Sequence, residues 1–271
     1  QDICDRLRDG KQTPDDLDKL TFLRRQYQDA TPDYGIHYSN DACCVGNIRQ
    51  LWRECNSDAF KRPVYICKAT YEATGTNQPI IDCLSSLPAK AYQYAPDILC
   101  VSEGCEVLLV KNINISAGLI NGAMGTVVAV VYENADAQAL HEGKCPPPYC
   151  LVVDFPGFHG FVLDDKESDS RFFPFNEHRQ WVPIYREKIV PALSDLPKSI
   201  RHRQPLSSFY RQQFPVDLVK HITAHRAQGQ SLVGLVSVDM NLDTADGSSI
   251  PSDIGSLLYV ALTRARLLKY L

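Results

Sequence analysis

The sequence has little that belongs to membrane or secreted proteins. No apolar run reaches the roughly 18 residues that a membrane-spanning helix needs. The first residues, QDICD, lack the basic and apolar pattern of a signal peptide, and the chain does not begin with methionine. We therefore expect part of a longer intracellular protein that works in a reducing compartment, with no membrane partner.

The Cys-x-x-Cys spacing of many zinc and redox sites is also missing, although the chain has 10 cysteines. Cys100 and Cys105 are separated by four residues, as are Cys145 and Cys150, and His141 precedes the second pair. This spacing leaves a zinc site open as an alternative. The scattered positions of the other cysteines favour free thiols, so we predict no metal site.

The net charge of −4 argues against a large nucleic-acid footprint, but the charge is unevenly distributed. A basic stretch with one acid, Asp217, suits phosphate contacts, and a solvated face is the alternative. Its basic residues are Lys198, Arg201, Arg203, Arg211, Lys220 and Arg226. The acidic residues 164–169 are expected to form an exposed loop rather than a calcium site.

A helix is expected over residues 11–28, because its start has three matching signals. Thr13 is placed to cap the helix, Pro14 takes the first helical position, and Asp16 completes the spacing of a capping box. This helix is interpreted as scaffold.

A strand, a polar turn and a second helix follow, as in an open parallel sheet. The strand covers residues 35–39, and Ser39, Asn40 or Asp41 is placed to cap a helix that runs to about Cys55. Ligands of such sheets lie at the carboxyl ends of the strands. The buried side of this helix is expected to carry Cys44, Val45, Ile48, Leu51, Trp52 and Cys55.

The pattern changes after residues 74–96, where glycine and proline interrupt it. Short strands without helices between them indicate a small barrel inserted into the α/β domain. They are expected at residues 105–110, 125–132, 149–155 and 180–185. We assign residues 1–98 to the first part of the α/β domain, 99–212 to the inserted barrel and 213–271 to the second part of the α/β domain.

The α/β pattern returns near the end of the chain, with two segments suited to phosphate. A strand over 219–223 breaks into a polar, basic turn over 223–230. A second strand over 235–239 precedes an apolar helix over 253–266, which carries Arg264 near its far end. Polar turns after strands and arginines at helix ends are typical of phosphate-binding elements.

Three blocks, whose order and spacing along the chain also agree, resemble hallmarks of superfamily 1B DNA helicases. Residues 223–232 (TAHRAQGQSL) resemble motif V, and residues 259–266 (YVALTRAR) resemble motif VI. Residues 108–112, 119–122 and 125–127 resemble the start of the SH3-like barrel of the Pif-type and RecD-like branch. The sequence is most similar to the Pif-type helicases and their Helitron-transposon relatives.

This resemblance implies an α/β fold: a second RecA-like motor domain, with a parallel sheet and flanking helices, interrupted by an SH3-like β-barrel. It implies ATP-driven 5′–3′ translocation on single-stranded DNA with duplex unwinding, in DNA repair, recombination or telomere maintenance. The implied partners are single-stranded and forked DNA and the N-terminal RecA-like domain of the full-length chain. The implied location is the nucleus or mitochondrion of a eukaryote.

Two elements of such a motor are missing from the sequence. The Walker A loop G-x-x-x-x-G-K-[ST] does not occur, and neither does an Asp-Glu pair for Mg²⁺. The cofactors ATP and Mg²⁺ would therefore be bound mainly by the missing N-terminal motor domain. We expect this fragment alone to be inactive as an ATPase.

On the nucleotide side, the resemblance assigns Arg264 to the arginine finger that reaches the γ-phosphate. The alternative is a surface arginine favoured at a helix end. Gln228 and Gly229 correspond to the nucleotide side of motif V, with a plain turn as the alternative.

On the DNA side, Thr223, His225 and Arg226 correspond to the residues that hold the phosphate backbone, although His225 could instead orient the turn. His221 receives no role. Further DNA contacts are expected, some with helix capping as an equal explanation. They are Ser39, Asn40, Asn47, Lys111 and Asn112.

Two other functions stay open. The missing motor half is compatible with a non-catalytic nucleic-acid-binding remnant of a transposon-encoded helicase. A different nucleotide-dependent enzyme with a RecA-like fold is the third alternative, which the barrel hallmark disfavours.

Overall fold

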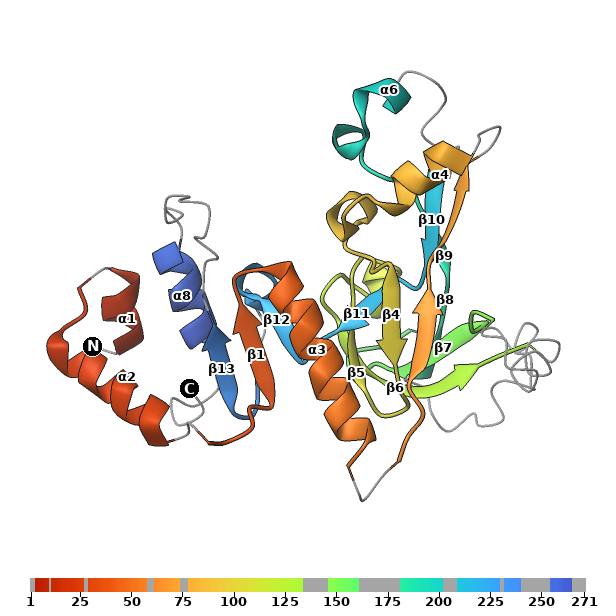
Figure 1. Ribbon diagram of the computed structural model, residues 1–271. Helices are drawn as coiled ribbons and strands as arrows, with labels where there is room; N and C mark the ends of the chain where they lie inside the picture. Colours follow the sequence, from red (N-terminus) through yellow and green to blue (C-terminus); the bar gives the residue numbers. More distant parts are fainter. Residues whose placement is uncertain are drawn as a thin grey trace. The chain divides into compact units, whose positions relative to one another are not determined.

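The computed structural model divides the chain into two compact units (Figure 1). Unit 1 consists of residues 1–50 and 219–271, and unit 2 of residues 51–218. β2 (Tyr65–Lys68), which lies between residue 50 and the predicted border near residue 98, pairs with β4 (Ile98–Val101) within unit 2. The extent of the inserted barrel, residues 99–212, stays a prediction. The structure describes residues 3–9, 11–26, 29–57, 61–73, 78–133, 146–160, 181–201, 209–229, 232–239 and 254–264.

Unit 1 is built on a three-stranded parallel sheet of order β12-β1-β13 (Figure 1). The strands are β1 (Tyr34–His37), β12 (His221–Thr223) and β13 (Val236–Asp239). Ile36 at the centre of β1 has no exposed surface, and Ile222 beside it is equally well buried. The predicted combination of a parallel sheet with helices is confirmed.

The helices of unit 1 follow the predicted positions closely. They are α1 (Ile3–Arg8), α2 (Pro14–Gln26), α7 (Ala224–Ala227), α8 (Ile254–Leu262) and α3 (Asn40–Cys55), of which residues up to Gln50 belong to unit 1. α8 buries Leu257 and Ala261, which lie one turn apart on the same side of the helix. α1 was not predicted; it packs against α8.

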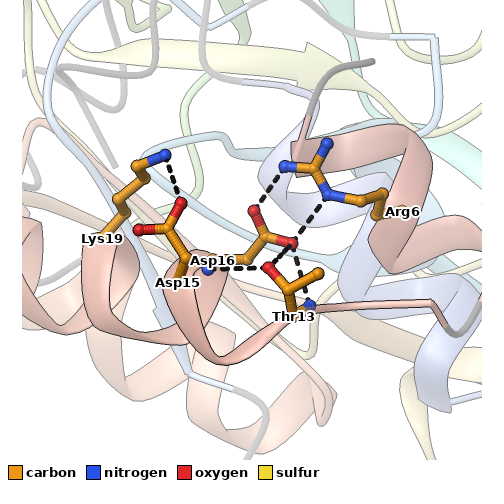
Figure 2. A network of polar contacts seen from close by, with 5 residues as sticks. All are labelled: Arg6, Thr13, Asp15, Asp16 and Lys19. Atoms are coloured by element: carbon orange, nitrogen blue, oxygen red, sulfur yellow. Dashed lines mark hydrogen bonds and ion pairs between the residues drawn. The ribbon is translucent and has the colours of Figure 1, made fainter.

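The predicted capping box at the start of α2 is present (Figure 2). The Thr13 amide donates to Asp16 Oδ2 at 3.0 Å, and the Asp16 amide donates back to Thr13 Oγ1 at 3.3 Å. Arg6 of α1 donates to the same carboxylate, through Nε at 2.8 Å and through a second nitrogen. The hydrogen bonds from Arg6 and Thr13 hold the pKa of the buried Asp16 carboxyl well below its usual range.

The buried side of α3 differs from the prediction. Of the residues expected inside, Leu51 and Cys55 are buried, but Cys44 is exposed, and exposed fractions are 48% for Val45, 40% for Ile48 and 46% for Trp52. The inward positions in the first turns belong to Cys43 and Asn47 instead. The reason is that the Asn47 side chain bonds to the backbone of His221, which turns this side of α3 inward.

Unit 2 is mainly antiparallel. Its largest sheet has the order β11-β5-β6-β7-β8, and smaller sheets have the orders β3-β10-β9 and β2-β4. The strands are β2 (Tyr65–Lys68), β3 (Thr70–Ala73), β4 (Ile98–Val101), β5 (Glu106–Leu109), β6 (Met124–Val131), β7 (Cys150–Asp154), β8 (Trp181–Tyr185), β9 (Glu187–Ile189), β10 (Phe209–Gln213) and β11 (Val216–Leu218). Its helical segments are α4 (Gln78–Ser85), η1 (Ala89–Tyr92), η2 (Ile115–Ala117), η3 (Leu193–Asp195) and α6 (Lys198–Arg201). Among the described strands the five-stranded sheet stays open, with β11 and β8 as unpaired edges.

Arg211 is not part of a surface patch, contrary to the sequence interpretation. It is 1% exposed, and its guanidinium carbon lies 4.0 Å from the ring centre of Tyr92 and 5.1 Å from that of Tyr71. Its guanidinium donates to the carbonyl of Ala95 at 2.7 Å. The Arg211 side chain therefore stabilises the interior of unit 2 through a hydrogen bond and contacts with aromatic rings. Arg203 and the acidic residues 164–169 lie outside the described residues.

Candidate nucleic-acid interface

Polar residues gather at the carboxyl ends of the parallel strands in unit 1. The strand register places His37 beside Thr223 on one side and beside Asp239 on the other. After β1 the chain passes through Ser39 into α3, and after β12 it enters the turn of residues 223–229. Since open α/β sheets bind ligands at this edge, we take it as the candidate site and call it the carboxyl edge.

The turn of residues 223–229 is fixed at its start and open at its end. Thr223 is 7% exposed, and its Oγ1 accepts a hydrogen bond from the Arg226 amide at 3.3 Å, which caps α7. His225, Gln228 and Gly229 are exposed. Gly229 has φ +82°, and nothing lies within 4 Å of the position a Cβ would take. The glycine is thus required by backbone conformation, and it leaves room for a ligand to approach the main chain.

Ser39 and Asn40 lie exposed at the start of α3. Ser39 Oγ accepts a hydrogen bond from the Ala42 amide at 3.2 Å, so the capping role considered from the sequence is present. Asn47 is 5% exposed and bonded to His221. Its role here is structural rather than a surface contact.

Arg264 follows the last turn of α8. Its backbone is hydrogen-bonded to Leu232, which comes shortly after the turn of residues 223–229. The Leu232 amide donates to the Arg264 carbonyl at 3.0 Å. The Arg264 guanidinium donates from Nε to the Val260 carbonyl at 3.1 Å and from Nη2 to Thr263 Oγ1 at 2.9 Å. The side chain is therefore folded against its own helix, and contact with a phosphate would replace these bonds.

Lys111 and Asn112 belong to unit 2, after β5. Lys111 forms an ion pair with Glu187 of β9. The Asn112 side-chain oxygen accepts from the Asn121 amide at 2.7 Å, which closes the loop around η2. Both residues thus have structural partners, and their contact with DNA stays a prediction.

His221, which received no role from the sequence, begins β12 and bonds to residues of α3 and β1. Asn47 donates to its carbonyl and accepts from its amide, each at 2.7 Å. Its ring Nδ1 lies 2.8 Å from Nε2 of His37. A Cβ on Gly35 would come within 2.3 Å of Nδ1, and one on Gly46 within 2.4 Å. Only the fold shows that these two glycines face one imidazole, so the sequence held no signal for this arrangement.

The cysteines do not form a metal centre in the described part of the chain. No group of three or more His, Cys, Asp or Glu residues there could hold a metal ion. Burial raises the pKa of Cys67 and Cys105 to about 12 and that of Cys150 to about 11, so these thiols stay protonated. His141 and Cys145 lie outside the described residues.

No helix in the described part is long and apolar enough to cross a membrane.

Residues 89–130 match the family described as DNA helicase Pif1, 2B domain. The matched segment contains β4, β5 and most of β6 in unit 2. No curated protein matches the chain.

Several solved structures are similar over 99% of this chain, among them the following three. Pif1 helicase from Candida albicans is 18% identical with a TM-score of 0.60, and 51% of its chain is covered. Bacteroides Pif1 bound to ssDNA is 16% identical, with a TM-score of 0.57 and 46% of its chain covered. Pif1 helicase from Bacteroides in complex with ADP-AlF3 and ssDNA is 16% identical, with a TM-score of 0.55 and 47% of its chain covered.

At these identities the likeness shows the fold, and the chain spans about half the length of the structures it matches. Together with the 2B domain match, it confirms the resemblance to Pif-type helicases. The chain has the fold of the C-terminal half of these proteins.

Proposed function

We propose that this chain is the C-terminal half of an ATP-dependent DNA helicase that moves 5′ to 3′ on single-stranded DNA and unwinds duplex. In this proposal unit 1 is the second RecA-like motor domain, and unit 2 contains the inserted SH3-like barrel. The observation that carries the proposal is the carboxyl edge, where the turn of residues 223–229 and the start of α3 follow neighbouring parallel strands. Ligand sites of such sheets form at this edge.

On the DNA side, the exposed His225 and the half-buried Arg226 would hold the phosphate backbone from the turn. Ser39 and Asn40 would add hydroxyl and amide contacts from the start of α3. Such contacts fix the strand without reading its sequence, as a translocating motor requires. Thr223 holds the turn in shape through its cap on α7.

On the nucleotide side, Arg264, Gln228 and Gly229 fit one side of an ATP site. The open main chain at Gly229 allows close approach of a phosphate, and a guanidinium can offer paired donors to phosphate oxygens. Bound ATP with Mg²⁺ would supply the phosphoryl-transfer chemistry. The phosphate cradle and the metal ligands would come from the N-terminal RecA-like domain. Forked DNA as substrate, a role in repair, recombination or telomere maintenance, and a nuclear or mitochondrial location belong to the same proposal.

Binding of the chain to a fluorescent single strand tests the DNA half of the proposal. Arg226→Ala should weaken binding to all sequences about equally and lower the slope of log affinity against log salt by about 0.7, as expected for one lost phosphate contact. Arg25→Ala, at an exposed arginine of α2, is the matched control. An equal loss in both variants, or no binding at low salt, would contradict the assigned interface.

The sequence encoded ahead of Gln1 tests the motor half. A Walker A loop and an Asp-Glu pair in frame within about 250 residues would support the helicase. If both are absent while the chain still binds single strands, the non-catalytic remnant becomes the better description.

A further inference from the structure

The inference concerns the two histidines that lie against each other beneath the carboxyl edge, His37 on β1 and His221 on β12. We propose that His221 is a positioning residue for the turn of residues 223–229, and that double protonation of the His37–His221 pair releases the turn and weakens its grip on DNA. The effect on DNA rests on the proposed function. The state of the pair can be measured without it.

His221 occupies a slot made for an imidazole. Its ring lies between Gly35 of β1 and Gly46 of α3, where any Cβ would come within 2.4 Å of the ring. The two imidazole planes are inclined by 24°, with centroids 5.1 Å apart. Asn47 holds the backbone of the same residue through two hydrogen bonds. One residue thus joins β1, α3 and β12, the elements that lead into the carboxyl edge.

The number of protons on the two rings decides whether the hydrogen bond between His37 and His221 can form. The facing nitrogens, His37 Nε2 and His221 Nδ1, are 2.8 Å apart, so one hydrogen lies between them. The neutral pair and the singly charged pair both satisfy this condition. When both rings are charged, each facing nitrogen carries a hydrogen, and two N–H groups cannot face each other at this distance. The doubly charged pair must therefore open.

The charged neighbours of the pair act in opposite directions. His37 Nδ1 lies 3.7 Å from a carboxylate oxygen of Asp239 on β13, which favours one positive charge on the pair. Burial outweighs this attraction and lowers the pKa of His37. Immediately before β12, the Lys220 ammonium lies over the Tyr34 ring at 4.6 Å. The adjacent α7 carries His225 and Arg226.

The sign of the pH dependence follows from the lowered pKa. The native state binds fewer protons at His37 than the unfolded chain does, so this part of the stability is complete above the ordinary histidine pKa of about 6.5 and is lost as the pH falls below it. Because the pair shares one hydrogen, it titrates as a unit, and its opening belongs to the second proton. His221 lies two residues before Thr223, the cap of α7, so opening displaces the start of the turn.

Nuclear magnetic resonance of the whole chain tests the pair directly and without DNA. Ring ¹⁵N shifts of His37 and His221 and amide shifts of residues 223–229 would be followed from about pH 7.5 to about pH 5. We expect the turn amides to shift together with the second protonation of the pair. In His37→Gln, whose amide can still bond to His221 but cannot become charged, they should stay near their neutral-pH positions. Turn amides that do not move, or that move equally in His37→Gln, overturn the inference.

Single-strand binding over the same pH range tests the consequence. Wild type should lose affinity on the order of tenfold relative to His37→Gln between about pH 7.5 and about pH 5. Both proteins keep His225, so any contribution of this residue is the same in the two proteins. His159→Gln, at an exposed histidine of unit 2, should behave as wild type.

A second variant, His221→Gln, keeps the test decisive if His37→Gln fails to fold. Its turn amide shifts and its affinity for single strands should depend as little on pH as those of His37→Gln. If the turn amides shift with the second protonation but neither wild type nor the glutamine variants bind single strands at any pH, the proposed function is wrong. The inference about the histidine pair then still holds. Equal pH dependence in wild type and both glutamine variants overturns the release mechanism.

Discussion

The side chain of Asn47 occupies both backbone hydrogen-bonding groups of His221, accepting from its N–H and donating to its C=O, each at 2.7 Å. Among the strands that the structure describes, β12 is an edge strand of the parallel sheet, and none of them lies beside these groups on that side. A single amide of α3 completes the hydrogen bonding that another strand would have supplied.

Asn47→Ala should therefore be strongly destabilising. It removes both partners from two backbone groups at a 5% exposed position, and we expect a loss of about 2–4 kcal/mol in the free energy of unfolding. Urea denaturation of the chain measures it. Asn56→Ala, which removes an exposed amide bonded to the Trp52 carbonyl, should change it by less than about 0.5 kcal/mol. Similar losses in the two variants would contradict the assigned role of Asn47.

Gly46→Ala should destabilise unit 1, although glycine to alanine inside a helix usually stabilises. The new Cβ would meet the His221 ring at 2.4 Å, and we expect a cost of about 1–3 kcal/mol. In a His221→Ala background the ring is absent, and the same change should gain up to about 1 kcal/mol from helix propensity. Thermal denaturation of the four proteins gives the coupling energy.

The sign reversal is the decisive outcome of this cycle. Gly157→Ala, where nothing lies within 4 Å of the new Cβ, serves as the neutral control. An unchanged cost of Gly46→Ala without His221 would mean that the glycine is required for some other reason.

Asp16→Asn should destabilise the chain at neutral pH and lose its effect in acid. The folded-state pKa of Asp16 lies below its ordinary value of 3.8, so its ionised form contributes stability above that value, which is lost as the pH falls through the folded-state pKa. Denaturation from neutral pH into acid should show the curves of wild type and variant converging.

Asp15→Asn is the control for this change. Asp15 lies on the same helical turn but is exposed and pairs only with Lys19 among the contacts drawn in Figure 2. Its loss should be small at every pH. Equal effects at the two positions would show that charge in the first turn matters, rather than the network of Arg6.

Arg264→Ala should separate the two proposed activities. In a longer protein that contains both motor domains, loss of the guanidinium should lower ATP turnover by roughly a thousandfold or more. Single-strand binding by the present chain should stay unchanged, because the DNA contacts are proposed for the turn of residues 223–229. Steady-state ATPase assays and fluorescence anisotropy measure the two quantities. Retained turnover would rule out a finger role for Arg264.

Local sequence patterns predicted those parts of the fold that short-range physics determines. The capping box of Thr13 and Asp16 and the strand that ends at Thr223 were predicted because each depends on a few neighbouring residues. The carboxyl edge could be predicted as a site because polar residues follow buried strands. The resemblance to helicase motifs then supplied roles for Arg264 and Gln228, which the isolated pattern could not.

The side of α3 that faces inward could not be predicted, for a physical reason. Val45, Ile48 and Trp52 form an apolar stripe, and the hydrophobic pattern alone favours burying it. The orientation is instead set by Asn47, whose partner His221 is 174 residues away in the sequence. Arg211 shows the same limitation, because its partners Tyr71 and Tyr92 come from distant parts of unit 2.

The hydrogen bond between Leu232 and Arg264 has a consequence for how this region tolerates change in length. This bond joins the two ends of the segment of residues 232–264, which contains β13 and α8. The segment therefore forms a closed loop. A segment closed in this way tolerates a change in its length at a small cost in loop entropy. The turn before Leu232 and the arginine at its far end would keep their alignment as the segment between them varies in length.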